Sequence, residues 1–184
     1  MILLTLGELV IDKDLTIDGP GAAMLTIDAS GNDPTPDSTL DDGDDTNDGD
    51  GSRVFRITDD DWHSGFQVEL TDVTLTGGDT GGRGGAIFST ESLELRRTLI
   101  RQNVARYSGG GIDLADISGN ANYGAPIAAA HLNIRESVIS QNESSYGGGG
   151  LSATTYYGTV LLERTTVSGN VATGNGGGIR LRAP

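Results

Sequence analysis

Three stretches of similar sequence recur along this chain of 184 residues, and they constrain its fold more than any other feature. They read IRQNVARYSGGGI (100–112), ISQNESSYGGGGL (139–151) and VSGNVATGNGGGI (167–179). In each copy an asparagine stands nine residues before the apolar residue that closes the glycine run. A constant distance between two fixed points, with variable residues between them, is typical of a structural repeat in which every copy makes the same turn.

The sequence before each asparagine repeats as well. An earlier copy, VELTDVTLTGG (68–78), places Gly78 where the others have asparagine, and a weaker fifth copy, DLTIDGP (14–20), matches DVTLTGG (72–78). Within each copy apolar residues alternate with polar ones over three to five residues, which indicates short strands with one buried face. We find no convincing period of 3.6 residues, so we expect almost no helix.

Each unit therefore holds three short strands, as around 93–95, around 98–100 and after the glycine run at 85–89. The units are 25, 39 and 28 residues apart. A unit of this size cannot bury its apolar face alone, whereas stacked units can, and stacking makes a solenoid. We predict an all-β fold, a right-handed parallel β-helix of about five coils with three short strands per coil. Its hand follows from the general preference of β-crossover-β connections.

We expect a single β-helix domain over 1–184, interrupted by loop excursions at 29–52 and 115–130. Firm strand patterns, AMLTID (23–28) and RVFRIT (53–58), flank the first excursion, but the sequence does not assign them to particular sheets. No export signal is recognisable at the N-terminus. We therefore expect the chain to be a part of a longer protein.

The repeated asparagines are predicted to form a structural ladder. Asparagine and glycine reach left-handed backbone conformations at low cost, which suits a fixed corner. Identical asparagines stacked coil upon coil also hydrogen-bond along their column. The predicted ladder consists of Asn103, Asn142 and Asn170.

A second column carries charges whose sign alternates along the chain. Opposite charges on neighbouring strands favour one register, which is a structural and not a catalytic role. This predicted ladder consists of Asp72, Arg97, Glu136 and Arg164, with Asp14 before them. Tyr107 and Tyr146, each five residues before the closing apolar residue, are expected to stack on adjacent coils, as packing rather than as a platform for a sugar.

The formal net charge of −14, with Lys13 as the single lysine, excludes nucleic acid and anionic membrane as natural partners. The absence of cysteine excludes disulfides and thiolate sites. No apolar run approaches the roughly 20 residues of a membrane span, so we expect no direct membrane insertion.

The segment DDGDDTNDGDG (41–51) is the sharpest candidate for a ligand site. Asp44, Asp45, Asp48 and Asp50 could supply oxygen ligands to calcium, the one cofactor that the sequence suggests. The segment does not fit an EF-hand, because position twelve counted from Asp44 is a phenylalanine. The alternative is a solvated acidic loop without a metal.

Enzyme activity is the main rival to a structural role, because many β-helices are polysaccharide lyases or glycoside hydrolases. The segment TDDDWHSG (58–65) holds three aspartates and His63, which could bind a metal or act as acid and base. A small basic patch for an acidic glycan could form from Arg96, Arg97, Arg101 and Arg135. The usual lyase signatures, such as a Gly-His-Gly segment, are absent from the sequence.

The combination of GGAI (84–87) with IRQN, ISQN and VSGN resembles the repeats of bacterial polymorphic outer-membrane proteins. More broadly, the chain is similar to bacterial surface proteins with pectin-lyase-like β-helices. The resemblance implies an extracellular or cell-surface location and a non-enzymatic stalk or adhesion role, with carbohydrate or another cell-surface ligand as partner. Without a polar capping unit, the terminal coils are also expected to associate end to end.

Overall fold

The computed structural model describes residues 1–33, 49–61, 65–115 and 129–183, and nearly all of its regular structure is β-strand. Within these ranges there is no α-helix, and a single 3₁₀ turn, Ser30–Asn32, follows β4. The segments 34–48 and 116–128, which make up most of the two predicted excursions, lie outside the described residues. No helix in the described part of the chain has the length and apolar character to span a membrane.

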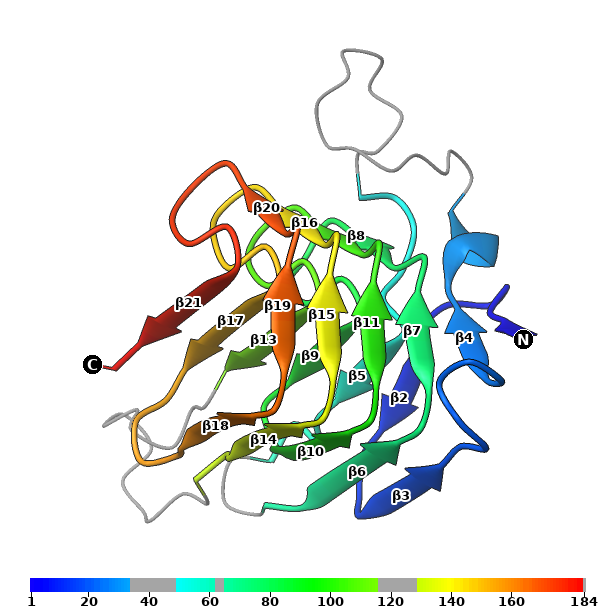
Figure 1. Cartoon of the computed structure of the whole chain (residues 1–184), viewed down its shortest axis with the longest axis horizontal. Helices are drawn as coiled ribbons and strands as arrows, with labels where there is room; N and C mark the ends of the chain where they lie inside the picture. Colours follow the sequence, from blue (N-terminus) through cyan, green and yellow to red (C-terminus); the bar gives the residue numbers. More distant parts are fainter. Residues whose placement is uncertain (34–48, 62–64, 116–128, 184) are drawn as a thin grey trace.

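All strands belong to four parallel sheets that run along the long axis of the molecule (Figure 1). Sheet A contains β1 (Ile2–Leu3), β4 (Thr26–Asp28), β7 (Thr74–Thr76), β11 (Leu99–Arg101), β15 (Val138–Ser140) and β19 (Thr166–Ser168). Sheet B contains β2 (Leu9–Ile11), β5 (Phe55–Ile57), β9 (Ile87–Ser89), β13 (Ile112–Ala115), β17 (Leu151–Thr154) and β21 (Ile179–Arg182). Sheet C contains β3 (Leu15–Asp18), β6 (Gln67–Thr71), β10 (Ser92–Arg96), β14 (Leu132–Arg135) and β18 (Val160–Glu163). Sheet D contains β8 (Asp79–Thr80), β12 (Val104–Ala105), β16 (Glu143–Ser144) and β20 (Val171–Ala172).

The chain visits the sheets in the order A, B, C in the first two coils, and in the order A, D, B, C from β7 onward. In Figure 1 it rises along sheet A in front, passes through sheet D at the top and returns through sheet B behind, while it advances from right to left. This winding is right-handed. The fold is thus the predicted right-handed β-solenoid of about five coils. From β8 onward, two-residue strands of sheet D add a fourth strand to the three predicted for each coil.

Stacking in register explains why the sequence pattern repeats. In sheet C the partners of Leu95 are Leu70 in the preceding coil and Ile134 in the next, so one inward column stays apolar from coil to coil. These three side chains are fully buried. A slip of one residue would turn every such side chain outward, and burial therefore fixes the register.

The first two coils differ from the alignment that the sequence suggested. We expected 14–20 to match 72–78, which would align Asp14 with Asp72 and Ile17 with Leu75. The structure instead pairs Ile17 with Leu70 in sheet C, and Ile27 takes the place beside Leu75 in sheet A. Asp14 therefore does not belong to the charged column.

The strands on either side of the first excursion now have definite places. Within AMLTID, β4 pairs with both β1 and β7 in sheet A. Within RVFRIT, β5 pairs with β2 and β9 in sheet B. The excursion therefore leaves and rejoins the second coil where the later coils have their strands of sheet D.

Candidate functional site

The three repeated asparagines lie one above another at the corner between sheets A and D. The side-chain Nδ2 of Asn103 donates to Oδ1 of Asn142 at 2.9 Å, and Nδ2 of Asn142 donates to Oδ1 of Asn170 at 2.9 Å. The same oxygens accept the backbone N–H of the preceding asparagine, and the backbone N–H of Gly78 donates to Oδ1 of Asn103 at 3.0 Å. Asn103 and Asn142 are buried. The column therefore satisfies backbone groups that the corner would otherwise leave without partners.

The left-handed backbone at this corner belongs to the residue before each asparagine and not to the asparagine itself. Gln102 has φ 54° and Gln141 has φ 55°, and glycine takes the same position in the copies at Gly77 and Gly169. The asparagines are thus required as hydrogen-bonding groups and not for their backbone conformation. This corrects the conformational half of the argument from sequence.

The glycine runs are constant because backbone from the next coil packs directly against them. A Cβ on Gly110 would lie 2.2 Å from the carbonyl oxygen of Glu143, and one on Gly149 would lie 2.0 Å from that of Val171. A Cβ on Gly111 would lie 3.2 Å from Cγ and Nδ2 of Asn142. The spacing from asparagine to glycine is therefore the length of a closed turn that packs on the ladder of the next coil.

The charged column lies at the corner between sheets C and A. Asp72, Arg97, Glu136 and Arg164 all have φ between 49° and 58°, which is the left-handed region. Asp72 forms an ion pair with Arg97, and Oε1 of Glu136 lies 2.9 Å from Nη2 of Arg164. The hydrogen bond from Arg97 holds the pKa of the Asp72 carboxyl below its usual range. These partly exposed pairs support the corner.

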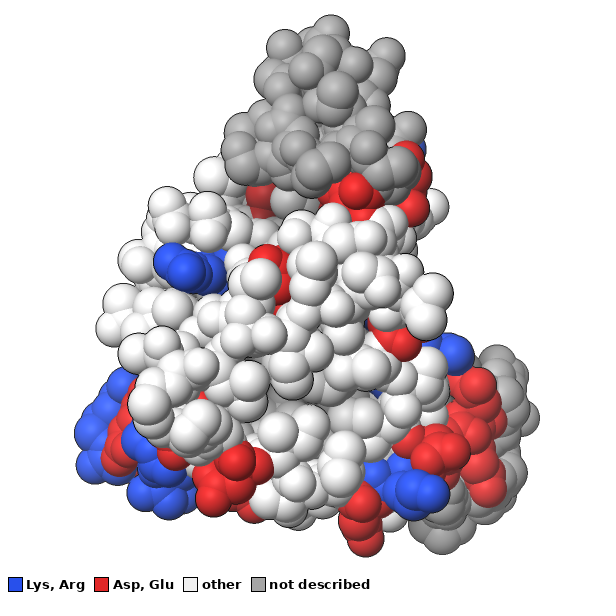
Figure 2. Space-filling model, turned by 90° about the vertical axis from the view of Figure 1, so that its right-hand side faces the viewer, with Lys and Arg blue, Asp and Glu red and all other residues white. Residues whose placement is uncertain are grey.

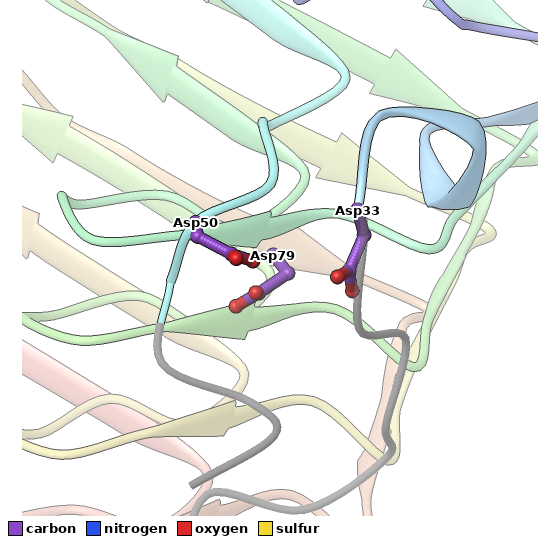
Figure 3. Close-up of side chains that lie close together, drawn as sticks. All are labelled: Asp33, Asp50 and Asp79. Atoms are coloured by element: carbon purple, nitrogen blue, oxygen red, sulfur yellow. The ribbon is translucent and has the colours of Figure 1, made fainter.

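A cluster of three aspartates lies at the open end of sheet D (Figure 3). Asp33 directly follows the 3₁₀ turn, Asp50 lies in the segment that leads into β5, and Asp79 opens β8. One carboxylate oxygen from each residue lies within 4.8 Å of the others. Backbone hydrogen bonds from Asp79 N–H to the Ser52 carbonyl (3.1 Å) and from Gly81 N–H to the Gly49 carbonyl (2.8 Å) hold the segment 49–52 against β8.

Burial makes Asp79 the unusual member of this cluster. Asp79 is 3% exposed, whereas Asp33 is half-buried and Asp50 is exposed. Burial, followed by the charges of Asp33 and Asp50, raises the pKa of Asp79 to about 6, although hydrogen bonds from the backbone N–H groups of Gly51 and Gly49 oppose the rise. A buried carboxyl group of this kind is stabilised when it binds a proton or when a cation lies beside it.

The metal ligands predicted from the sequence are only partly within the described structure. Asp44, Asp45 and Asp48 lie outside the described residues, and Asp50 is the predicted ligand that the structure places. It lies beside Asp33 and Asp79, which the sequence analysis did not single out. Asp79 carries no clear signal in the sequence, because its column of sheet D holds Val104 in the next coil and another acid, Glu143, in the one after.

The residues considered for catalysis do not converge in the described structure. His63 lies outside the described residues, and Asp60 forms an ion pair with Arg56 at 2.9 Å. Among the arginines of the predicted basic patch, Arg97 is paired with Asp72, and Arg135 lies 3.5 Å from Glu163. Neighbouring carboxylates thus neutralise much of the charge that an acidic glycan would need.

The turns between asparagine and glycine carry exposed aromatic side chains. Tyr107 and Tyr146 lie on adjacent coils with ring centroids 6.0 Å apart, and they are 53% and 63% exposed. The two rings thus lie next to each other on adjacent coils as predicted, but they are tilted by 33° and more than half of each side chain remains accessible. The pair offers an apolar, hydrogen-bonding surface on an otherwise polar turn.

Comparison with known proteins finds similarity to a repeat family. Residues 164–181 match the family model of the Chlamydia polymorphic membrane protein (Chlamydia_PMP) repeat. The matched segment contains the corner at Arg164, the strands β19 and β20, Asn170 and the last glycine run. No curated protein and no solved structure matches the chain. The chain therefore carries a repeat of this kind within a stack of parallel sheets that is typical of β-helix repeat proteins.

Proposed function

We propose that this chain is a non-enzymatic β-helical segment of an extracellular or cell-surface protein, where it serves as a stiff stalk with an adhesive surface. The match of 164–181 to the polymorphic membrane protein repeat carries the proposal, because such repeats belong to surface proteins of the autotransporter type. The columns of the matched segment continue through the preceding coils in register. This continuity supports the proposal that the other coils belong to the same kind of surface segment.

The stiffness follows from the way in which each coil is bound to its neighbours. Four parallel sheets and two side-chain columns connect successive coils, so bending the solenoid would strain several sets of bonds together. A solenoid of this kind holds its surface turns at fixed intervals along one axis. It is thus suited to present repeated contacts to another surface.

The adhesive surface is proposed to be the row of turns that carries Tyr107 and Tyr146. A pair of exposed tyrosines can stack against the apolar face of a sugar ring, and it loses little side-chain entropy on binding. We therefore propose carbohydrate of a cell surface as the ligand class.

A glycan array and a bead adhesion assay test this role. Beads coated with the protein are expected to bind a subset of glycans, and Tyr107→Ser combined with Tyr146→Ser is expected to lower binding at least tenfold. Tyr157→Ser, which alters a tyrosine that is 73% exposed outside these turns, is the matched control. Equal binding by both variants would contradict the assignment of the surface.

Incubation with pectate, alginate and other polyuronates tests the enzymatic alternative. The proposal expects no unsaturated product and no new reducing ends. Turnover that Arg97→Ala or Arg135→Ala abolishes would replace the proposal with a polysaccharide lyase. Antibody labelling of intact and permeabilised cells of the native organism separately tests the surface location, since the proposal expects labelling without permeabilisation.

Calcium binding is a second candidate, favoured by the convergence of Asp33, Asp50 and Asp79. Carboxylate oxygens are the ligands that Ca²⁺ prefers, and a cation would remove the cost of ionising Asp79 in a buried position. Titration with millimolar CaCl₂ is expected to raise the melting temperature of the native protein but not that of Asp79→Asn, with NaCl at equal ionic strength as control. An equal response of both proteins to calcium would exclude this cluster as the site.

A further inference from the structure

The tyrosine turns, residues 80–87, 105–112 and 144–151, are equivalent segments of three successive coils that strand pairing in sheet D aligns. They contain two charged residues, Arg83 and Arg106, and both are exposed. The turns therefore carry positive charge on a chain whose formal net charge is −14.

Most of the other arginines in the described structure are paired with an acid. A carboxylate oxygen lies within 4.0 Å of Arg53, Arg56, Arg96, Arg97, Arg135 and Arg164. Among the described residues, no such partner lies beside Arg83 or Arg106. Figure 2 shows both situations, because basic side chains at its lower margins lie against acidic ones, whereas a basic group on the left lies among uncharged residues. An exposed arginine without an internal partner can bind an anion from outside the protein.

Both arginines of the turns lie next to Tyr107. Arg106 directly precedes it in the same turn. The backbone N–H of Tyr107 donates to the carbonyl oxygen of Gly82 at 2.9 Å, and that of Tyr146 donates to the carbonyl oxygen of Tyr107 at 2.9 Å. The three turns are thus stacked directly upon one another, and Arg83, which follows Gly82, lies in the turn next to Tyr107.

The first of the three turns has a glycine, Gly82, at the tyrosine position. A Cβ there would lie 2.7 Å from Nη2 of Arg53, so a guanidinium group occupies the place of a side chain. Arg53 is held by its ion pair with Glu8, and its side chain is 16% exposed. The row across the turns therefore runs from a fixed guanidinium group over two tyrosine rings, with Arg83 and Arg106 beside it.

Acids next to the turns expose little of their charge. Asp79 directly precedes the first turn and Asp113 directly follows the second, and each is 3% exposed. Asp113 also accepts a hydrogen bond from Oγ of Ser108, which lies within the second turn. Glu143, directly before the third turn, is half-buried. The two arginines are thus the exposed charges of the turns, and physiological salt screens acids that lie more than about 8 Å away.

We propose that the ligand of the tyrosine turns is an anionic sugar, whose ring packs on the two tyrosines while its carboxylate or sulfate group binds Arg83 and Arg106. A guanidinium group binds such an anion through two parallel hydrogen bonds, and an aromatic ring covers the apolar face of a sugar. The inference rests on the proposed adhesive role of these turns and adds the charge of the ligand. It places the acidic glycan apart from the predicted basic patch, whose arginines are largely paired with acids.

Titration calorimetry with three short glycans at physiological ionic strength tests the charge of the ligand. The probes are a heparin hexasaccharide for sulfate, a sialic acid hexamer for carboxylate and maltohexaose as the neutral sugar, each titrated into the full chain. At least one anionic probe is expected to bind at least tenfold more tightly than maltohexaose. Selective binding of the heparin hexasaccharide assigns sulfate, and selective binding of the sialic acid hexamer assigns carboxylate. Equal affinity for all three probes, or no binding of either anionic probe, would overturn the inference.

Substitution of the arginines tests which residues bind the anion. Arg83→Gln combined with Arg106→Gln is expected to lower the affinity for the anionic probe at least tenfold. Arg106→Lys, which keeps the charge but loses the planar fork, is expected to lower it less than Arg106→Gln does. Arg164→Gln is the matched control, because it removes an exposed arginine at the corner between sheets C and A. Circular dichroism checks that each variant is folded.

The variant that combines Tyr107→Ser with Tyr146→Ser separates this inference from the proposed function. Loss of anionic binding in both the arginine and the tyrosine variant supports the inference. Loss in the tyrosine variant alone would overturn it and leave the adhesive role standing, whereas loss in the arginine variant alone would contradict both. If the double arginine variant does not fold, Arg106→Gln is compared with Arg164→Gln, and equal affinities of these two would overturn the inference.

Discussion

Replacing Asn142 with alanine removes the central member of the asparagine column. Its Oδ1 accepts hydrogen bonds from the backbone N–H (3.2 Å) and from Nδ2 (2.9 Å) of Asn103. Its Nδ2 donates to the carbonyl oxygen of Ile100 (3.0 Å) and to Oδ1 of Asn170 (2.9 Å). The residue is 1% exposed, so solvent does not replace these four bonds without a change in structure.

The expected cost follows from these four bonds. Each contributes about 1 kcal/mol net, and a buried N–H left without an acceptor adds about 1–3 kcal/mol. In Asn142→Ala the backbone N–H of Asn103 is left without an acceptor, whereas Nδ2 of Asn103 still donates to the carbonyl oxygen of Arg101 at 2.8 Å. Asn170 is only partly buried, so water can satisfy its Oδ1. We expect Asn142→Ala to lower the free energy of unfolding by about 3–5 kcal/mol.

Urea denaturation followed by circular dichroism measures this change. Asn170→Ala is the matched control, because Asn170 makes three hydrogen bonds of the same kind in the partly exposed last coil. Its expected cost is smaller, about 1–2 kcal/mol, since water reaches this end of the column. A cost below about 1 kcal/mol for Asn142→Ala, or equal costs for both variants, would refute the claim that the column carries stability.

Two further predictions follow from the glycine runs and from the buried aspartate. Gly149→Ala is expected to lower the free energy of unfolding, measured by urea denaturation, by at least about 2 kcal/mol, which is typical of overpacking. The reason is that its Cβ would lie 2.0 Å from the Val171 carbonyl oxygen. Gly178→Ala is the control and should change the free energy of unfolding little, because its Cβ would lie 3.5 Å from its nearest neighbour. Folding raises the pKa of Asp79 from 3.8 to about 6, so the folded state keeps a proton that the unfolded chain has lost, and the free energy of unfolding falls as pH rises from 4 to 6. The fall should reach about 3 kcal/mol and disappear in Asp79→Asn, while the exposed Asp12→Asn keeps it. Equal slopes in all three proteins would contradict the assignment to Asp79.

The repeat could be read from the sequence because parallel stacking gives equivalent residues equivalent surroundings. Leu70, Leu95 and Ile134 occupy one buried column, and each lies beside the next in register. The sequence therefore records the coil directly, as a spacing between similar residues. The same reason explains why the number of coils and the parallel pairing were predictable from the repeat, whereas the hand followed from the general preference of β-crossover-β connections.

The first two coils were harder to predict because one short pattern occurs twice within a single turn. LTID appears at 15–18 and again at 25–28, although the first copy lies in sheet C and the second holds β4 of sheet A. Similar letters thus occupy different sheets, and only the pairing of Ile17 with Leu70 distinguishes them. The strands of sheet D escaped prediction because two residues are too few to show a period.

The aspartate cluster was beyond sequence reasoning for a different reason. Asp33 and Asp79 are separated by 46 positions, and they meet because the backbone of residues 49–52 is hydrogen-bonded to β8 while Asp33 lies beside Gly51. No repeat governs the predicted excursion at 29–52, so no column indicates its contacts. Asp79 does not stand out in the repeat either, because its column of sheet D also holds Glu143 on the other side of Val104.

The fold separates residues that build the coil from residues that are free to change. Asn103, Asn142 and the glycines after them close each turn through backbone contacts, and these positions are constant among the copies. The residues between them form the short strands of sheet D, whose backbone bonds also connect the coils, but some of their side chains are exposed, and in two copies these include the tyrosines Tyr107 and Tyr146. Substitution of these exposed side chains changes the surface without changing the register of any strand. A solenoid of this design can therefore acquire a new binding surface on its turns while the asparagine column continues to hold its coils.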